Sequence, residues 1–432
     1  SFLAPMILAL HELEKPQQWW NGEVQDYVEH TAVLAYKTQD TVEAHHTDGI
    51  AGATGKCCCS TCLHEGILAG GSSYSAPFLA PAERVVDDNG VEVVQISSRR
   101  DVLLPGTSAD AGREDRQDLP LRTWNQRQRA LEHLEAIVDR PEQEKRDARR
   151  DLGNQGPGVY EHLASYKAGI PWFTALDPMH ADHVCFIPLI FDCLTGAITT
   201  IRAGPDLSET VLEAMDRLHL ASAQYKATAT AQTVRSFQKM GHFKAWEWKS
   251  IVVDELPALV LNLGLDPQIE ELLLLLSKVI RLLDGAVVDT GDYEGDPMAF
   301  DVLALRPDGL DVVPLDVVEK LLGRLLILRE VLFYNRDPGY LLKVVTATPH
   351  RMAHRAAFLR MLGPSRTHSQ QNLESVIGVD KRKVGSRFHP LANMATIGRD
   401  SNLLLLLDRK YTLPPLTLPT QQPPSQTHSK LP

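Results

Sequence analysis

Two pairs of metal-ligating residues stand far apart in this 432-residue chain. Cys59 and Cys62 form a C-x2-C pair inside "CCCSTC", and His350 and His354 form an H-x3-H pair. Helix positions four apart share one face, so both imidazoles can reach one ion. Two thiolates and two imidazoles complete the tetrahedral set of a closed, structural zinc site. The spacing therefore predicts a Zn²⁺ site that joins segments 288 positions apart (350 − 62).

The choice of thiolates is open at this point. Cys57 and Cys58 precede the C-x2-C pair and could replace either member of it. The opposing interpretation is that these are idle thiols and that the histidines lie on the surface. Four of the six cysteines are clustered, which is typical of an intracellular metal site or a reduced thiol cluster rather than of a disulfide framework.

A carboxylate, Asp177, ends the apolar run "GIPWFTAL" and opens "DPMH". Asp-Pro commonly opens a turn, and Asp is a good helix N-cap when Pro follows it. One interpretation therefore gives Asp177 only a local role. The other interpretation is a functional carboxylate, and only the rest of the sequence can support it.

Glu374 is a second candidate carboxylate, in a basic surrounding. Residues 350–390 carry eight Lys or Arg against two acids, a net charge of +6 (8 − 2) in a chain of net charge −11. A lone acid in such a segment is often only a salt-bridged surface group. The functional interpretation is a metal-holding carboxylate beside side chains that bind DNA phosphates, here Lys381, Arg382, Lys383 and Arg387.

Composition sets the broad class of protein. Hydrophobic residues are 44% and charged residues 23% of the chain, so a packed core is expected. The acidic balance argues against a wholly basic nucleic-acid coat but allows local basic patches. The N-terminus has no basic segment before its short apolar run, and no run reaches the length of a membrane span. We expect an intracellular protein that is not secreted and does not enter a membrane.

Hydrophobic periodicity predicts the elements that position these residues. Helices are expected over residues 7–20, over 123–152 with a break near Pro141, and over most of 206–345. The apolar runs 169–177 and 184–201 are predicted to supply a central sheet and an element packed on it. The predicted divisions are 1–62 with the C-x2-C pair, a low-order insertion over 63–121, a helix and central strands over 122–205, a helical insertion over 206–345, the H-x3-H helix and Glu374 over 346–400, and a disordered tail over 401–432.

Three further motifs follow one another along the chain. They are "LDPMH" at 176–180, "FKAWEWK" at 243–249 and "HRMAHRAAFLRMLGP" at 350–364. Together with the C-x2-C pair and "L-E-S" at Glu374, they resemble CACTA-type (En/Spm-like) DNA transposases over most of residues 1–395. The resemblance implies an α/β protein with an incomplete RNase H-like (DDE) catalytic core. A large, mostly helical insertion would separate the second catalytic Asp from the Glu.

The resemblance also implies roles for individual residues. It places the second catalytic Asp at Asp177, with His180 close enough to assist, and the catalytic Glu at Glu374. The implied activity is DNA cleavage and strand transfer with two Mg²⁺ ions, hard cations that prefer carboxylate oxygens. The implied partner is DNA, at the terminal inverted repeats of a transposon, in the nucleus. A second copy of the chain is a further partner to consider.

The first catalytic Asp is expected upstream of the segment with which this sequence begins, and the sequence has no initiator Met. We therefore expect a truncated or decayed copy, part of a longer protein, with weak or no catalysis. One alternative is a catalytically dead, transposase-derived protein that binds DNA or protein partners. Another is an unrelated helical binding module stabilised by zinc.

Overall fold

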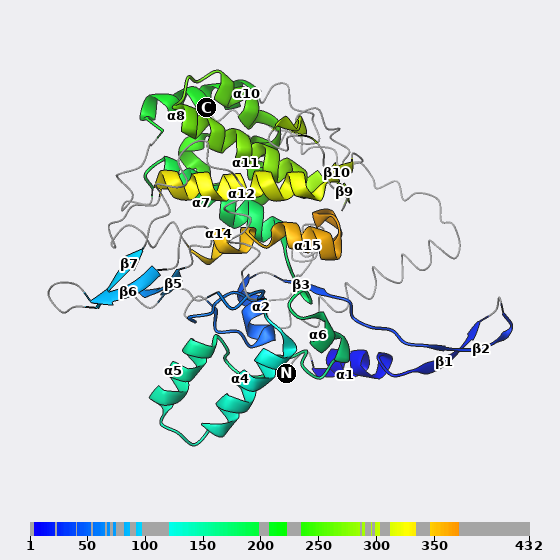
Figure 1. Cartoon of the computed structure of the whole chain (residues 1–432). Helices are drawn as coiled ribbons and strands as arrows, with labels where there is room; N and C mark the ends of the chain where they lie inside the picture. Colours follow the sequence, from blue (N-terminus) through cyan, green and yellow to red (C-terminus); the bar gives the residue numbers. More distant parts are fainter. Residues whose placement is uncertain are drawn as a thin grey trace, which may run out of the picture. The chain divides into compact units, whose positions relative to one another are not determined.

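The structure is a computed structural model, and it describes part of the chain. The described residues are 4–21, 24–39, 41–52, 55–64, 67–69, 72–74, 82–86, 92–96, 121–197, 207–222, 235–285, 287–289, 295, 299–302, 312–333 and 346–370. They belong to the first of two compact units, Ser1–Gln370 and Gln371–Pro432. The fold of this unit is mixed α/β and mostly helical (Figure 1).

The first helix is shorter than the sequence predicts. α1 (Ala4–Leu13) ends before Pro16, and an antiparallel hairpin of β1 (Gln17–Asn21) and β2 (Asp26–His30) follows. The helix predicted through residue 20 is therefore wrong in its second half. Proline cannot donate a helical hydrogen bond and disfavours helical geometry in the residue before it.

The insertion predicted over residues 63–121 contains hairpins in its described part. Each of two short antiparallel pairs joins neighbouring strands: β4 (Ile67–Ala69) with β5 (Ser72–Tyr74), and β6 (Ala82–Val86) with β7 (Glu92–Ile96). The backbone of this segment is thus partly regular, in short strands, and the Val and Ile residues of β6 and β7 favour such strands.

The charged helical segment breaks where proline predicts. α4 (Trp124–Ala136) begins at a capping box between Thr123 and Gln126, and α5 (Glu142–Leu152) begins directly after Pro141. Gly153 ends α5 with φ of 64°, a conformation that glycine adopts without strain. The predicted break near Pro141 is therefore confirmed.

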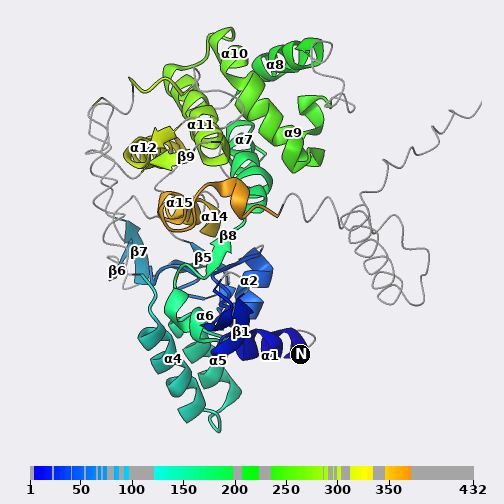
Figure 2. The ribbon, with the colours of Figure 1, turned by 90° about the vertical axis from the view of Figure 1, so that its right-hand side faces the viewer.

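A parallel pair of strands positions Asp177. β3 (Lys37–Gln39), which precedes α2 (Thr41–Asp48), pairs with β8 (Thr174–Leu176), with Gln39 opposite Leu176. In Figure 2, β8 lies between α6 (Ala164–Gly169) and the helices α14 (Ala347–Met352) and α15 (Arg355–Leu362), and α15 contacts it. Among the described residues, this pair is the part of the expected central sheet that is present.

The segment after Asp177 is helical rather than β-rich. A π-helical segment, η3 (Met179–Phe186), continues into α7 (Ile187–Leu194). The apolar run 184–201 was predicted to be β-rich or mixed, and its residues 184–194 form helix, which periodicity alone does not separate from a buried strand. Pro188 explains the wide turn before it, since a proline inside a helix removes one backbone bond and displaces a carbonyl.

The residues after 206 form a helical region with a large apolar core. Its helices and short segments are α8 (Glu209–Ser222), η5 (Phe237–His242), α9 (Ala245–Ser250), η6 (Ile251–Glu255), α10 (Leu256–Leu261), α11 (Pro267–Gly285) and α12 (Leu315–Phe333). A short parallel pair, β9 (Val287–Asp289) with β10 (Val312–Pro314), joins α11 to α12. α11 and α12 pack side by side (Figure 1). The predicted helical character of this region is confirmed in its described part.

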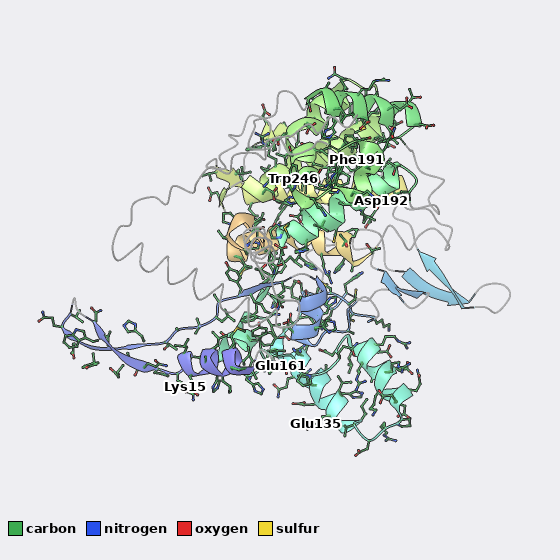
Figure 3. All side chains as sticks on the ribbon, turned by 180° about the vertical axis from the view of Figure 1, so that it is seen from behind. Lys15, Glu135, Glu161, Phe191, Asp192 and Trp246 are labelled. Carbon is green, nitrogen blue, oxygen red and sulfur yellow. The ribbon has the colours of Figure 1, made fainter. Side chains whose placement is uncertain are left out.

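α7 also packs in the core of the helical region. Phe191, labelled in Figure 3, has its ring centroid 5.0 Å from that of Trp248 on α9. A second, smaller apolar cluster lies among α1, α6 and the residues before β8, around Tyr166 and Phe173. None of the described helices combines the length and the apolar composition needed to cross a bilayer.

Candidate metal centre and carboxylate site

The four predicted metal ligands lie together. One ligand atom from each of Cys59, Cys62, His350 and His354 lies within 4.8 Å of the others, and all four residues are buried. Cys62 Sγ is 3.2 Å from His350 Nε2, which is 3.4 Å from His354 Nε2. Two ligands of one tetrahedral zinc lie roughly 3.3–3.8 Å apart, given Zn–N bonds of about 2.0 Å and Zn–S bonds of about 2.3 Å. The donor set and its spacing fit a metal such as zinc.

The loop that carries the cysteines is fixed by hydrogen bonds to its backbone. The buried Arg122 donates from Nε to the Cys59 carbonyl and from Nη2 to the Cys57 carbonyl, each at 2.7 Å. The amide of Arg122 donates to the Thr61 carbonyl at 2.9 Å. The Thr61 amide in turn donates to Cys59 Sγ at 3.3 Å, a contact that favours the thiolate. Arg122 thus holds the loop in a ligand-ready conformation.

The histidines lie on either side of a tight turn. His350 belongs to α14, and His354 is the N-cap residue of α15. The amides of Ala353 and His354 donate three residues back, to the carbonyls of His350 and Arg351, at 3.1 and 3.0 Å. The single helix predicted for this segment is therefore wrong in its middle, because such bonds define a 3₁₀ turn. The turn still directs both imidazoles to one point.

Electrostatics at the cluster favour metal binding. Burial opposes ionisation of Cys59, but a hydrogen bond from Cys62 and the nearby His350 and His354 bring the pKa of Cys59 well below its usual value. The same pairing, together with burial, raises the pKa of Cys62. Burial also lowers the pKa of His350, which keeps its imidazole neutral. Thiolate and neutral imidazole are the forms that ligate a metal, and a cation would ionise the second thiol as well.

The structure chooses between the thiols that the sequence left open. Cys59 and Cys62 face the histidines, whereas Cys57 Sγ donates to the Leu63 carbonyl at 3.5 Å. Cys57 also lines a cavity of about 260 Å³, which residues of α4, α6 and β8 complete. The C-x2-C pair is therefore the pair placed to bind the metal.

Asp177 forms the second candidate site. It stands directly after β8 and is 2% exposed. Its Oδ1 accepts from the Gln370 amide at 2.7 Å, and its Oδ2 accepts from the His180 amide at 3.1 Å and from His180 Nδ1. Burial acts to raise the pKa of Asp177, but these hydrogen bonds outweigh it and hold the pKa below its usual value. Asp177 is thus a buried, ionised carboxylate, the form that a divalent cation binds.

The segment before Glu374 returns to the ends of β3 and β8. Gln370 Nε2 donates to the Thr38 carbonyl at 2.9 Å, and Thr38 Oγ1 donates to the His368 carbonyl at 2.8 Å. Residues 368–370 therefore lie across the strand pair beside Asp177. The remaining predicted site residues lie outside the described residues: Glu374, Lys381, Arg382, Lys383 and Arg387.

Sequence reasoning missed two buried polar contacts on η3. Asp182 Oδ2 accepts from Arg355 Nη2 at 2.9 Å, with both side chains fully buried. His183 Nε2 lies 2.9 Å from Asp284 Oδ2, which also accepts from Lys249 Nζ at 3.1 Å. A signal was present, because Lys249 ends "FKAWEWK" and Arg355 follows the H-x3-H pair. The three motifs meet at η3.

A buried ion pair was also missed on the other side of the strand pair. Lys37 Nζ on β3 lies 2.8 Å from Asp48 Oδ1 at the end of α2. Thr174 Oγ1 on β8 donates to Asp48 Oδ2 at 2.7 Å, and the Lys37 ammonium lies 4.8 Å from the Tyr160 ring centroid. These contacts tie α2 to both strands and make Asp48 a structural carboxylate.

Part of the basic segment faces inward. Arg351 and Arg355, two of the eight basic residues between positions 350 and 390, are buried. Arg360 is exposed, and its Nη2 donates to Glu319 Oε1 at 3.0 Å. Arg351, Arg355 and Arg360 thus all contact other parts of the fold through their guanidinium groups.

Comparison with known proteins finds no matching family, no matching curated protein and no matching solved structure.

Proposed function

We propose that this chain is a transposase-like protein of the CACTA type that cleaves and joins DNA strands with divalent metal ions held by carboxylates. The observation that carries the proposal is the position of Asp177, directly after β8 and beside the parallel strand β3. The carboxyl ends of neighbouring parallel strands meet at one edge of a sheet, where catalytic groups of α/β proteins gather.

Two further carboxylates complete the proposal. Gln39 pairs with Leu176, and the residue after Gln39 in the sequence is Asp40, as Asp177 follows Leu176. Asp40 lies outside the described residues. We name it as a partner carboxylate because it follows the neighbouring strand end, although the family resemblance implies a carboxylate upstream of Ser1.

Glu374 is the third carboxylate of the proposal. It follows Gln370 by four positions (374 − 370), and the Gln370 amide donates to Asp177. Four residues span at most roughly 14 Å of extended chain, so a metal ion shared with Asp177 is within the reach of Glu374. Bound Mg²⁺ would supply Lewis-acid stabilisation of the attacking and leaving oxygens of a phosphodiester. The protein's own residues would orient that carboxylate set, and His180 would keep Asp177 ionised.

Zinc is the metal that we propose for the Cys59, Cys62, His350 and His354 cluster. Soft thiolates and imidazoles select zinc over Mg²⁺, and four protein ligands leave no position for a substrate. The role of the zinc is therefore structural: it joins the loop after α2 to α14 and α15.

A plasmid-nicking assay tests the proposal without knowledge of the DNA target. Supercoiled plasmid is incubated with the zinc-loaded chain and Mg²⁺ or Mn²⁺, for wild type and for Asp177→Asn, Asp40→Asn and Glu374→Gln. We expect nicking by wild type and a loss of 100-fold or more, on the order of 3 kcal/mol of transition-state stabilisation, in each variant. Asp254→Asn is the matched control, because Asp254 is exposed on η6.

One observation favours a second function, DNA binding without catalysis. Both oxygens of Asp177 already accept hydrogen bonds from the chain itself, from His180 and Gln370. If wild type binds plasmid but nicks it no faster than Asp177→Asn, the proposed catalysis is wrong and the binding function stands. Replacing Lys381, Arg382, Lys383 and Arg387 by Ala should then weaken binding and flatten its salt dependence. The matched control replaces the same number of charges on α4 and α5, at Arg129, Arg146, Arg149 and Arg150.

A further inference from the structure

One buried arginine contacts both chain segments that hydrogen-bond to Asp177. Arg355 is 0% exposed, and its Nη2 donates to Asp182 Oδ2 at 2.9 Å and to Ser365 Oγ at 2.8 Å. Asp182 belongs to η3, and Ser365 begins η9 (Ser365–Thr367). These two elements are distant in sequence, and Arg355 joins them directly.

Each of the two elements supplies one side of the Asp177 environment. η3 carries His180, whose amide and imidazole bond to Asp177 Oδ2. η9 leads to Gln370, whose amide bonds to Asp177 Oδ1. The guanidinium of Arg355 therefore connects the residues on the Oδ2 side to those on the Oδ1 side.

Arg355 is also adjacent to the metal cluster. It follows His354, the N-cap residue of α15, and is the first residue of that helix. Any shift of His354 on metal binding would be passed to Arg355 through one peptide bond, which is rigid. The buried arginine thus lies on a covalent and hydrogen-bonded route from the cluster towards Asp177.

We propose that Arg355 is a positioning residue: through Asp182 and Ser365 it sets the placement of the two segments that hold the Asp177 carboxylate, and it links that placement to the metal cluster. Its catalytic meaning rests on the proposed function, but the positioning itself does not. Arginine suits this role because its planar guanidinium holds two acceptors in fixed directions, which a lysine ammonium on a flexible stem does not.

A second buried arginine, Arg329, has a different recorded ion pair. Arg329 on α12 is also fully buried and pairs with its neighbour Glu330 at 3.2 Å, within one helix. Arg355 instead joins η3 to η9, which are 183 positions apart from Asp182 to Ser365 (365 − 182).

Hydrogen–deuterium exchange of the zinc-loaded full chain tests the proposal. Peptides over 177–186 and 365–370 report the two sides of Asp177, and a peptide over 267–285 in α11 reports global opening. In Arg355→Lys we expect exchange on the order of tenfold faster in both site peptides, the effect of losing one hydrogen bond to a charged group. The α11 peptide should exchange as in wild type.

Variants that remove one of the two acceptors of Arg355 keep the test decisive if Arg355→Lys folds poorly. Ser365→Ala should accelerate exchange only in 365–370, and Asp182→Asn mainly in 177–186. Removing zinc by chelation should accelerate both. The matched control is Arg324→Lys, because Arg324 bonds twice to Glu271 and joins α12 to α11 away from Asp177; it should leave both site peptides unchanged.

Two results would overturn the proposal. Unchanged exchange in both site peptides of Arg355→Lys would show that Arg355 holds neither segment. Faster exchange in all three peptides would show a role in global stability alone. The experiment needs neither DNA nor a catalytic metal, so a chain that fails the nicking assay can still pass it, and an active chain can still fail it.

Discussion

The metal cluster and the Asp177 site both join residues that are far apart in sequence, but they do so with different chemistry. In the cluster, side chains separated by 288 positions supply four ligands to one point. At Asp177, the partner from 193 positions away is a backbone amide, that of Gln370. A cation can hold the first arrangement together, whereas hydrogen bonds and packing must hold the second.

The metal cluster and the Asp177 site also differ in their apolar surroundings. Cys59 and Cys62 form a small buried cluster of their own, separate from the two apolar cores of the described residues. Asp177 is followed by η3, whose Phe186 belongs to the large apolar core of the helical region. We therefore expect the loop at the cluster to gain stability from a bound metal, while the Asp177 site is stabilised by the core next to it.

Loss of the metal should have the largest effect on the protein. The double variant Cys59→Ala/Cys62→Ala should lose one zinc ion per chain, and so should His350→Ala/His354→Ala. Zinc binding by four such ligands contributes on the order of 10 kcal/mol to folding in small zinc domains. We expect part of that loss in urea unfolding, with the loop of residues 55–64 and α14 opening first. Metal analysis and hydrogen exchange measure the two effects.

The exposed Cys185 provides the control for that experiment. Cys185→Ala should keep one zinc ion per chain and the urea midpoint of wild type. If zinc stays bound when both histidines are removed, the four residues do not share an ion. A cation would then not join the two distant segments at the cluster.

The pH dependence of stability should differ in sign between two neighbouring carboxylates. Burial raises the pKa of Asp182 to about 6, although Arg355 opposes the shift. Its contribution to stability is therefore greatest below its unfolded pKa and is lost as the pH rises through 6, by about 3 kcal/mol for a shift of this size. The pKa of Asp177 is lowered, so its contribution is present above its unfolded pKa and is lost as the pH falls.

Urea unfolding between pH 3.5 and 7 checks these opposite slopes. Relative to wild type, Asp182→Asn should become more stable as the pH rises from 4 to 6. The variant lacks the carboxyl group whose ionisation destabilises the wild-type fold over this pH range. Asp177→Asn should instead be least destabilised relative to wild type at the lowest pH, where the Asp177 carboxylate of the wild-type protein would be protonated. Equal slopes in the two variants would show that the two carboxylates share one environment. Each variant is compared with wild type at the same pH and zinc concentration, so that acid release of the metal, which affects both proteins, cancels from the difference.

The sequence predicted the cluster better than it predicted the carboxylate site. Cys59, Cys62, His350 and His354 could be chosen by residue type and spacing, because few side chains ligate zinc. The contacts of Asp177 could not, because a backbone amide such as that of Gln370 carries no signal in residue type. The buried Arg355 was counted with the basic segment, since charge alone does not show which way a side chain faces.

The fold shows the same limit. The helices from 209 to 333 were predicted from strong periodicity, and the break at Pro141 from proline chemistry. The apolar run after Asp177 could be predicted only as β-rich or mixed, because a short apolar run fits a buried strand and a buried helix equally well. Pairing of β3 with β8 joins residues 137 positions apart at Lys37 and Thr174 (174 − 37), and no local pattern specifies such a partner.

The smallest expected effect is on zinc binding, and it tests how strongly the metal cluster and the Asp177 site are coupled. Asp177→Asn keeps the shape of the side chain but replaces one acceptor oxygen by a donor group, so one of its buried hydrogen bonds is lost, about 1–2 kcal/mol in urea unfolding. Its zinc content should stay at one ion per chain, because the loss of one hydrogen bond, passed on through Arg355, can weaken the binding of a tightly held zinc ion without emptying the site. Arg360→Ala is the control on α15, since Arg360 is exposed and its ion pair contributes under 1 kcal/mol by the usual range of surface pairs. If Asp177→Asn releases zinc while Arg360→Ala does not, then the cluster and the Asp177 carboxylate form one cooperative site. Each of them would then stabilise the other through Arg355.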